Sequence, residues 1–542
     1  MANNNGTGPT SLLDLPPEIL SKVISYMVEP SGRSSIQSVL RTCRQLYEVA
    51  LPFSVSVFRN TVHHHKGGGP CSPIKNAQFL HYLLISKPWL ARHVNTIILG
   101  SFTSTTIQGD ENKGDDKLQA PTSADSELAV YQSQIETILG QISPEDEDHS
   151  SWCTEWMSDL KTGYSDAQVT LILLICPNIH TLLFEESKNP RHFVRLLRFL
   201  GYLSLTSPPG WSNNPILPLS NLEDLFHETN NIQNGYTRWY EQGPLLFTLP
   251  RLRYYECNIP VGNERAGEQF GQLPPKSSSI EEITLRSSSI IPITLSAMLR
   301  ACKALRKLEY TSYTNSSSTV QTVAPRDILD AILLQADSLT ELYINTEEDW
   351  DKGWGLRSPN ILYMGIGLRQ MVALRKLTVG MQCLTGLLAE KPSNQNENHP
   401  VPLKVDDAPT IVDCLPENLE YLKIHSCSAA IHEQAQELLT AVESGNRFKN
   451  LVYISLLFNG WLSEKPLPLS CNAPNVHLDI GHQSKSTYQH DLGHPYSDRE
   501  IEGRGARNVT SRIHASKMRR EYLATRGITE PRHKPFYFVD DY

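Results

Sequence analysis

The feature that most constrains this chain is a short phrase that recurs ten times along it. An apolar residue is followed, after two mostly polar positions, by a second apolar residue and, one position further on, usually by a third. Alternate residues of a β-strand share one face, so the second half of the phrase predicts a short strand with one apolar face. The ten copies begin at Val94, Ile179, Leu222, Leu252, Ile280, Leu305, Leu339, Leu374, Leu419 and Leu451.

Apolar runs of helical character precede several copies of the phrase. Residues 167–178 precede the copy at Ile179, residues 294–304 precede the copy at Leu305, and residues 326–338 precede the copy at Leu339. The order helix, turn and strand is therefore repeated. One such unit cannot bury its apolar face alone, and stacked units would share a continuous core and a curved sheet face. An ordinary α/β domain with a parallel sheet remains the alternative interpretation.

The N-terminal segment predicts a compact helical module. In residues 11–27, Pro17 suits the first turn of a helix, and an apolar stripe of helical spacing follows it up to Met27. Ser11 and Asp14 are both candidate helix caps. Pro30 and Gly32 are expected to end this helix. A second apolar stripe in residues 34–52 predicts one further amphipathic helix that Pro52 closes.

The motif Leu15-Pro16-Pro17-Glu18-Ile19-Leu20, followed by a polar turn and by the run from Val39 to Leu46 with a central Cys43, resembles the F-box. The resemblance implies a helical trio over residues 11–58 whose apolar face binds a Skp-type adaptor, and through it a cullin and a RING subunit. Its implied adaptor-binding residues are Leu13, Leu15, Pro16, Ile19, Leu20, Ile24, Val39, Leu40, Cys43 and Leu46.

The recurring phrases resemble the irregular leucine-rich repeats that follow many fungal-type F-box modules. From Ile179 onward the copies lie 25 to 45 residues apart, which exceeds the roughly 20–29 residues of regular repeats and implies inserted loops. The resemblance implies an α/β solenoid over residues 75–480. Polar stretches at 103–127, 143–151, 261–279, 312–323 and 390–410 are expected to be mobile insertions.

Composition excludes some classes of function. The chain has 58 acidic and 49 basic residues, and its net charge of −9 argues against nucleic-acid and anionic-membrane binding. The N-terminus lacks the features of a secretory signal, so we expect a soluble protein of the cytoplasm, the nucleus or both. From residue 481 on, 11 basic residues outnumber 8 acidic ones, and few large apolar residues are present. We expect this tail to be largely disordered, with a short helix near 511–526.

No pattern in the sequence indicates a catalytic, metal or cofactor site. The ten cysteines form no CxxC pair and lie mostly in apolar stretches, which is typical of reduced core thiols. The three histidines at 63–65, beside three glycines, are interpreted as a solvated loop.

Together with the two resemblances, this favours a substrate-recognition adaptor of a ubiquitin ligase that captures an unknown target protein. A scaffold that acts outside ubiquitination and an enzyme of unrecognised α/β fold remain the alternatives.

Overall fold

The computed structural model describes residues 12–31, 33–64, 67–69, 71–102, 125–142, 149–187, 190–206, 217–229, 239–258, 260–312, 323–346, 363–387, 409–459 and 469–483. The chain divides into two units, residues 1–62 with 68–493 and residues 63–67 with 494–542. The elements below belong to the first unit, apart from part of a small strand pair formed by β2 (Val62–His64) and β3 (Gly67–Gly69).

Three helices form the N-terminal module. A single 3-10 turn, η1 (Leu12–Asp14), leads into α1 (Pro17–Ser31), and α2 (Arg33–Leu40) and α3 (Arg44–Val55) follow. The prediction of one helix over 34–52 was wrong, because Cys43 is extended (φ −154°, ψ 166°) and separates two helices. Pro52 does not close α3, which continues to Val55. The module therefore ends at Val55, and residues 57–58 belong to the first strand of the sheet.

A single large sheet follows the module, and all of its strand pairings are parallel. Its main path has twelve strands in the order in which they occur along the chain, and the short β8 (Val261–Gly262) pairs only with β9. The chain is thus an α/β protein with a parallel sheet. The twelve are β1 (Val57–Asn60), β4 (Thr96–Leu99), β5 (Thr181–Glu185), β6 (Asp224–Glu228), β7 (Tyr254–Asn258), β9 (Glu282–Ile290), β10 (Lys307–Ser312), β11 (Glu341–Asn345), β12 (Lys376–Gly380), β13 (Tyr421–Cys427), β14 (Tyr453–Asn459) and β15 (His477–Gln483).

All ten copies of the phrase form strands of this sheet, from β4 to β14. The middle apolar residues stand in register from strand to strand, as in Leu308 beside Ile283 on one side and Leu342 on the other. The first and middle positions of every copy are at most 3% exposed. Each such buried side chain contributes about 1.5–3 kcal/mol. Strands β1 and β15 carry no copy of the phrase and were missed, although Val476, Leu478 and Ile480 alternate as a strand requires.

A repeated backbone hydrogen bond sets the start of each strand. The carbonyl oxygen of Glu223 accepts the N–H groups of both Arg253 and Tyr254, at 3.0 Å each. The same two-donor arrangement recurs from the carbonyl of Ser56 to that of Glu420, once for each copy of the phrase. Because an unpaired buried carbonyl is costly, this arrangement ties each unit to the next at one fixed residue.

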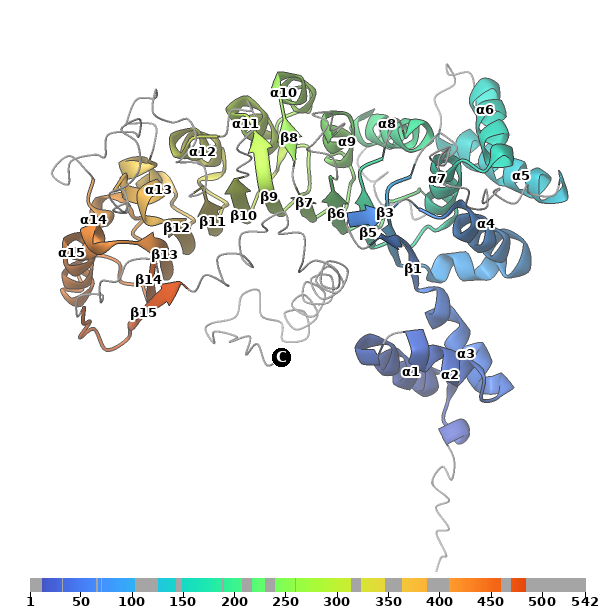
Figure 1. The fold of residues 1–542 in the computed structure, drawn as a ribbon, viewed down its shortest axis with the longest axis horizontal. Helices are drawn as coiled ribbons and strands as arrows, with labels where there is room; N and C mark the ends of the chain where they lie inside the picture. The colour runs from blue at the N-terminus through green and yellow to red at the C-terminus, as the bar shows by residue number, and fades with distance from the viewer. Residues whose placement is uncertain are drawn as a thin grey trace, which may run out of the picture. The chain divides into compact units, whose positions relative to one another are not determined.

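The helices pack along one side of the sheet (Figure 1). Local sequence starts several of them: proline occupies the first turn of α11 and α12, and the side chain of Asn263 accepts the N–H of Ala266 at the start of α10. The helices and 3-10 or π turns are α4 (Pro73–His81), η2 (Tyr82–Ser86), η3 (Pro88–His93), α5 (Asp125–Ile142), α6 (His149–Thr162), α7 (Ser165–Ile175), α8 (Arg191–Thr206), α9 (Trp239–Leu246), α10 (Glu264–Gly271), α11 (Pro292–Ala301), α12 (Pro325–Ile332), η5 (Leu333–Gln335), η9 (Gly365–Gln370), α13 (Met381–Thr385), α14 (Ile411–Cys414), η11 (Ala429–Ile431) and α15 (His432–Glu443).

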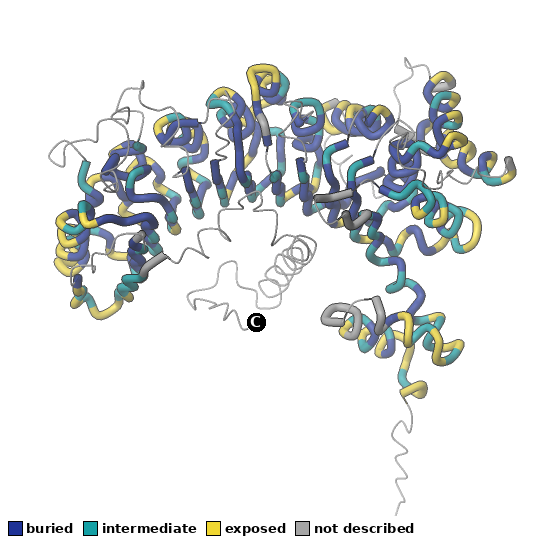
Figure 2. The backbone as a smooth tube through the Cα atoms, viewed as in Figure 1, coloured by how far each residue is buried: buried dark blue, intermediate teal, exposed yellow. Residues whose placement is uncertain are grey.

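One continuous apolar core runs between the helices and the sheet, from Leu51 to Leu469. Figure 2 shows the strands and the inner sides of these helices buried, whereas the N-terminal module is largely intermediate or exposed. Among the described helices, none combines the length and the apolar character that a bilayer crossing needs.

Two expectations about loops need comment. The segment 261–279 was expected to be a mobile insertion, but it contains β8 and α10, and α10 buries Ala266 and Phe270 against the core. Ordered helices also cover the ends of two other expected insertions, at residues 125–127 and 149–151. The expected disordered tail, with its helix near 511–526, lies outside the described residues except for 481–483.

Candidate functional site

The N-terminal module has a small core of its own. Leu20 and Ile24 of α1, Ile36 of α2 and Ala50 of α3 are each at most 4% exposed. They hold the three helices together, while Leu51 and Val55 at the end of α3 join the core of the sheet. Leu40 of α2 packs against the same core, so the module is continuous with the rest of the first unit.

Exposed apolar side chains are concentrated in residues 12–26 of the module. Leu12, Leu13, Ile19 and Tyr26 are 51, 38, 47 and 64% exposed, and Pro16 beside them is also exposed. Exposed apolar groups that gather on one short segment mark an interaction surface more often than scattered ones do. We call Leu12, Leu13, Pro16, Ile19 and Tyr26 the module patch.

The ten residues that the F-box resemblance indicated fall into three groups. Leu13, Pro16 and Ile19 belong to the module patch. Leu20 and Ile24 are buried, which is at odds with the expectation that they lie on the binding face; in the free module they pack the helices together. The others are partly buried: Leu15, Val39, Leu40, Cys43 and Leu46.

A hydrogen bond between distant residues holds the module patch in place. The side-chain Nε2 of Gln45 on α3 donates to the carbonyl oxygen of Leu13, at 2.9 Å. Since Leu13 lies in the turn that precedes α1, this bond ties the start of the module to its last helix. The position of Leu13, which is 38% exposed, is thereby fixed through its backbone.

The second candidate surface is the side of the sheet that faces away from the helices. We call it the polar face; its side chains stand at the first, third and fifth strand positions, between the buried apolar rows. At its centre, Arg286 of β9 lies between two carboxylates of the neighbouring strands, 3.1 Å from Glu256 and 3.0 Å from Glu309. Lys376 of β12 pairs with Glu341 of β11 at 2.8 Å.

Electrostatics in this central group are strongly coupled. Burial by itself would lower the pKa of the Arg286 guanidinium, but the carboxylates of Glu309 and Glu256 outweigh burial and raise it. The hydroxyl of Tyr254 donates to Glu256, and burial together with this carboxylate holds the pKa of Tyr254 well above its usual range. Arg286 is therefore a permanent cation and Tyr254 a permanent donor at ordinary pH.

The far end of the polar face is aromatic. The rings of Tyr421 and Tyr453 stack at 4.6 Å with planes 2° apart, and His477 continues the row at 5.4 Å. Asp479 accepts hydrogen bonds from Tyr453 and Ser455, at 3.1 Å each. Polar-face residues went unassigned in the sequence, although they occupy the intervening positions of the same phrases, which is the signal that points to them.

A buried acid–histidine group lies among helices α6, α7 and α8. His192 Nε2 is 2.9 Å from Asp159, and the indole N–H of Trp152 donates to its Nδ1 at 3.2 Å. Asp166 accepts the backbone N–H groups of His192 and Phe193 at the start of α8. Burial raises the pKa of Asp166 despite these contacts. Both ring nitrogens of His192 are engaged, so the group serves to lock three helices together.

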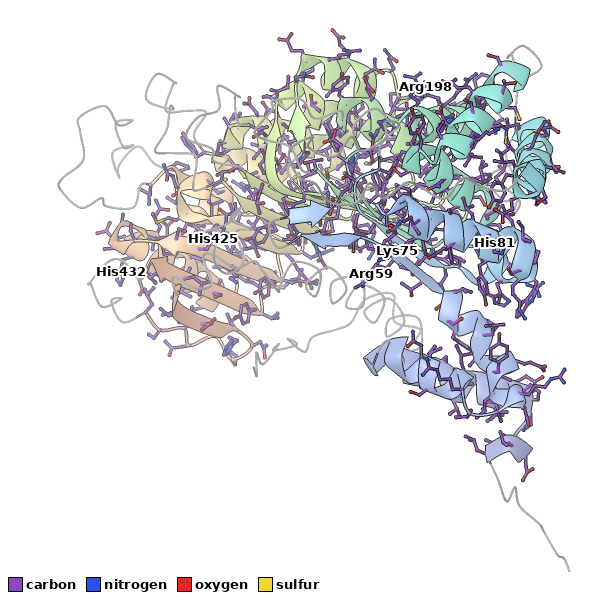
Figure 3. All side chains as sticks on the ribbon, turned by 45° about the vertical axis from the view of Figure 1, so that its right-hand side comes forward. Arg59, Lys75, His81, Arg198, His425 and His432 are labelled. Carbon is purple, nitrogen blue, oxygen red and sulfur yellow. The ribbon has the colours of Figure 1, made fainter. Side chains whose placement is uncertain are left out.

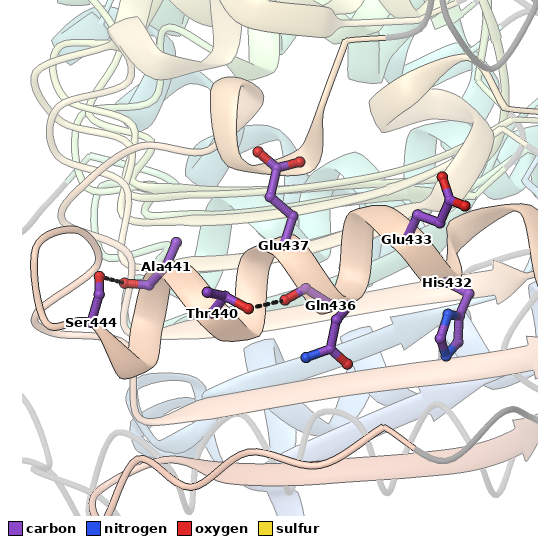
Figure 4. A pocket seen from close by; sticks show the side chains of 7 residues that line it. All are labelled: His432, Glu433, Gln436, Glu437, Thr440, Ala441 and Ser444. Atoms are coloured by element: carbon purple, nitrogen blue, oxygen red, sulfur yellow. Dashed lines mark hydrogen bonds between the residues drawn. The ribbon is translucent and has the colours of Figure 1, made fainter.

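A hollow of about 700 Å³ lies along α15 (Figure 4). Its lining comes from one helix and the residue after it, running from His432 to Ser444. The two dashed bonds in Figure 4 are local to α15 and the residue after it: the hydroxyl of Thr440 donates to the carbonyl of Gln436 and that of Ser444 to the carbonyl of Ala441, at 2.8 Å each. With no second described element lining it, this hollow brings no set of chemical groups together.

Cysteines and metal-binding residues give no site in the described part of the chain. None of the ten cysteines forms a disulfide, and eight of them are buried, as their apolar surroundings indicated. Burial raises the pKa of Cys302 and that of Cys414 to about 12, so these thiols pack as apolar groups. Within the described ranges, no three histidine, cysteine or acidic side chains are grouped closely enough to hold a metal ion.

Neither a scan against protein-family models nor a search of curated proteins finds a match for this chain.

Proposed function

We propose that the chain is the substrate-recognition adaptor of a Skp-cullin-F-box ubiquitin ligase rather than an enzyme. The N-terminal module would be an F-box that docks on a Skp-type adaptor. The sheet and its helices would be an irregular leucine-rich-repeat-like array that captures a target protein. The observation that carries the proposal is the module patch: it includes Pro16 and Ile19 of the LPPEIL motif and lies at the start of a three-helix module.

The module patch has the chemistry that an adaptor helix requires. Burying Leu13 and Ile19 against a partner would remove two largely exposed apolar side chains from water. A few buried apolar anchors supply most of the affinity in many interfaces. Leu20 and Ile24 support this patch from within the module instead of contacting the partner.

The array would act by proximity. A target held on the array is kept near the conjugating enzyme that the cullin core recruits, which raises the effective concentration of its lysines. The array needs no reacting group of its own for this. The strand order along the chain and the shared backbone bond between units support an extended recognition surface built from repeated units.

The test is co-purification of the tagged full-length chain with the Skp-type adaptor of its host. The double variant Leu13→Asp with Ile19→Asp should lose the adaptor. The matched control is Ile293→Asp with Leu334→Asp, because these array side chains are 57 and 50% exposed. The control should keep the adaptor, since it adds the same charges at distant exposed apolar positions.

Two outcomes would contradict the proposal. Adaptor binding that survives in the double variant would show that the module patch is not the docking surface. Adaptor recovered without any cullin, from cells in which other F-box proteins recover both, would favour a scaffold that acts outside ubiquitination.

A further inference from the structure

The last strand of the sheet has one edge that no described strand covers. β15 lies at the end of the sheet (Figure 1) and pairs along all seven of its residues with β14, without a bulge. The strand contains neither lysine nor proline, residues that often protect an exposed edge. Its outer edge is therefore a regular backbone template for another strand.

The direction of one backbone hydrogen bond shows which groups of β15 face outward. The N–H of His477 donates toward β14, to the carbonyl oxygen of Val452 at 2.9 Å. Successive residues of a strand direct their N–H and C=O groups to opposite sides, so those of Leu478 and Ile480 point away from β14. Val476 offers only its carbonyl to a further strand, because its N–H donates to the carbonyl of Ala473 at 3.2 Å.

The apolar core is incompletely covered at this end of the sheet. Leu422 of β13 and Ile454 of β14 are 0% exposed. Val476, Leu478 and Ile480 pack against the same core but are only partly buried. A strand added beside β15 would therefore remove apolar side chains as well as backbone groups from water.

The sequence of β15 is complementary to itself. In an antiparallel pair of two copies centred on Leu478, each Val476 lies opposite Ile480 of the second copy, and the two Leu478 residues lie opposite each other. On the polar face, each His477 lies opposite Asp479 of the second copy. An imidazole can donate a hydrogen bond to a carboxylate in either of its protonation states. This register thus matches apolar side chains with apolar ones and a donor with an acceptor.

Backbone geometry agrees with this register. The outward groups of Leu478, Ile480 and Val476 would make about four hydrogen bonds between the two copies. His477 and Asp479 would form the pairs without backbone bonds, in which opposing Cα atoms lie closer, about 4.5 Å apart. An axis at Asp479 would instead set two carboxylates opposite each other, and an axis at Ile480 would set Leu478 opposite His482.

We propose that two copies of this chain associate through β15, in an antiparallel pair about a two-fold axis at Leu478. The sheet of one copy would then continue into that of the other. A single strand pair is a small interface, so the association is expected to be reversible. The inference does not depend on adaptor binding. In an adaptor, it would bring two recognition arrays into one assembly.

Sedimentation velocity of the full-length chain measures the association, over concentrations from about 1 to 200 µM. The fraction of dimer should rise with concentration. His477→Asp should raise the dissociation constant about tenfold, because two carboxylates then face each other on both sides of the axis. Gln436→Glu, at an exposed position on α15, adds the same charge elsewhere and should leave the dissociation constant unchanged.

Exchanging the two polar residues tests the register. His477→Asp combined with Asp479→His restores a carboxylate opposite each imidazole, so this double variant should associate more tightly than His477→Asp alone. Asp479 also accepts hydrogen bonds from Tyr453 and Ser455. Circular dichroism therefore checks that the double variant is folded before the comparison is made.

Disulfide trapping tests the register without altering these polar residues. Leu478→Cys should form a disulfide-linked dimer when copper–phenanthroline is added as oxidant, because paired Cα atoms at the axis lie about 5.5 Å apart. Asn475→Cys is the control, since its two copies would lie roughly 20 Å apart and should not be linked. The unaltered chain, which keeps the partly buried Cys471, gives the background.

Several outcomes would overturn the proposal. A chain that stays monomeric over this concentration range has no such interface. Equal dissociation constants for His477→Asp and the unaltered chain, or equal trapping of Leu478→Cys and Asn475→Cys, would place the contact elsewhere. Species that grow beyond the dimer would indicate head-to-tail pairing of β15 with β1 of the next copy instead of a two-fold pair.

Discussion

The imidazole Nε2 of His425 on β13 lies 3.2 Å from the carbonyl oxygen of Ile344 on β11, although β12 runs between these two strands. At the β12 position paired with His425 stands Gly380, which has no side chain to separate them. The ring also stacks near Tyr343, with centroids 6.3 Å apart. His425, which is labelled in Figure 3, therefore connects strands that are not neighbours.

This relationship predicts that Gly380→Val destabilises the chain by about 1–3 kcal/mol, because the new side chain occupies the space beneath His425. The backbone at Gly380 (φ −70°, ψ 145°) suits valine, so strain is not the cause. Thr378→Val, on the same strand and face, is the control and should cost less. Urea unfolding followed by circular dichroism measures both, and equal losses would contradict the role given to His425.

His227 interrupts an otherwise apolar row. It is 1% exposed and occupies the last of the three apolar positions of its phrase, where every other copy has an apolar or aromatic residue or a cysteine. Neither nitrogen of its ring has a hydrogen-bond partner among the described residues. We expect His227→Leu to stabilise the chain by about 1–2 kcal/mol, since an unsatisfied buried polar group is removed. Thermal unfolding at pH 7 measures this. A lower melting temperature would show that the imidazole contributes favourably.

The same histidine predicts an acid-dependent loss of stability. Burial lowers its pKa to about 3 in the folded chain, against about 6.5 when unfolded. The unfolded state therefore takes up the proton first, and stability that is complete above pH 6.5 falls as pH decreases toward 3, by up to about 1.4 kcal/mol per unit. His227→Leu should flatten this part of the pH profile, and an unchanged slope would rule out His227 as its source.

Arg286→Met should destabilise the chain by about 3–5 kcal/mol, because it leaves Glu256, at 3% exposure, as a buried charge without its cation. Arg253→Met removes a cation that is 65% exposed and 4.0 Å from Glu281, and serves as the control. It should cost at most about 1 kcal/mol. Chemical denaturation at pH 7 measures both changes, and losses of equal size would contradict this account.

Two long strands contain a serine in the left-handed region, Ser287 of β9 (φ 47°) and Ser426 of β13 (φ 52°), each at the sixth residue of its strand. A left-handed backbone costs a non-glycine residue about 1–2 kcal/mol. Ser426→Gly should therefore be neutral to stabilising. Ser288→Gly is the control, because Ser288 is also buried but lacks the positive φ, and it should destabilise by about 1 kcal/mol. Similar effects of the two changes on the melting temperature would exclude backbone strain at Ser426.

Substitutions at two neighbouring residues of α1 should distinguish an effect on the stability of the module from an effect on adaptor binding. Leu20→Ala is expected to destabilise the module by about 2–5 kcal/mol, because Leu20 is 1% exposed. Ile19→Ala, at 47% exposure, should change stability by less than about 0.5 kcal/mol while weakening adaptor binding. Hydrogen exchange of the α1–α3 amides reports stability, and co-purification reports binding. A folded Leu20→Ala module that still exchanges slowly would contradict the core assignment.

The sheet could be predicted from the sequence because its information is local. Every copy of the phrase, such as those at Leu305 and Leu374, became a strand with its apolar positions buried. The contacts of the polar face could not be predicted in this way. Arg286 meets Glu309 only because β9 and β10 align in one register, and His425 reaches Ile344 only because Gly380 leaves room. Such pairings depend on registers between segments that lie tens of residues apart.

The helical module shows the same limit at short range. The apolar stripe of residues 34–52 is continuous in sequence, so nothing in its periodicity marked the break at Cys43. Tertiary packing decides where such a stripe bends. The motif alone likewise does not specify which of its residues are buried. The packing of the three helices leaves Leu13 and Ile19 exposed and buries Leu20.

The carbonyl oxygen that accepts two N–H groups before each strand lets the sheet tolerate connections of different lengths. Each unit is aligned with the next at this carbonyl and not by a fixed number of residues, so the 25 to 85 residues between successive carbonyls of this kind can vary while every strand still starts in register. Lengthening a connection alters its own surroundings and leaves the alignment of later units intact. Insertions and deletions can therefore change the loops between units while the sheet itself stays the same.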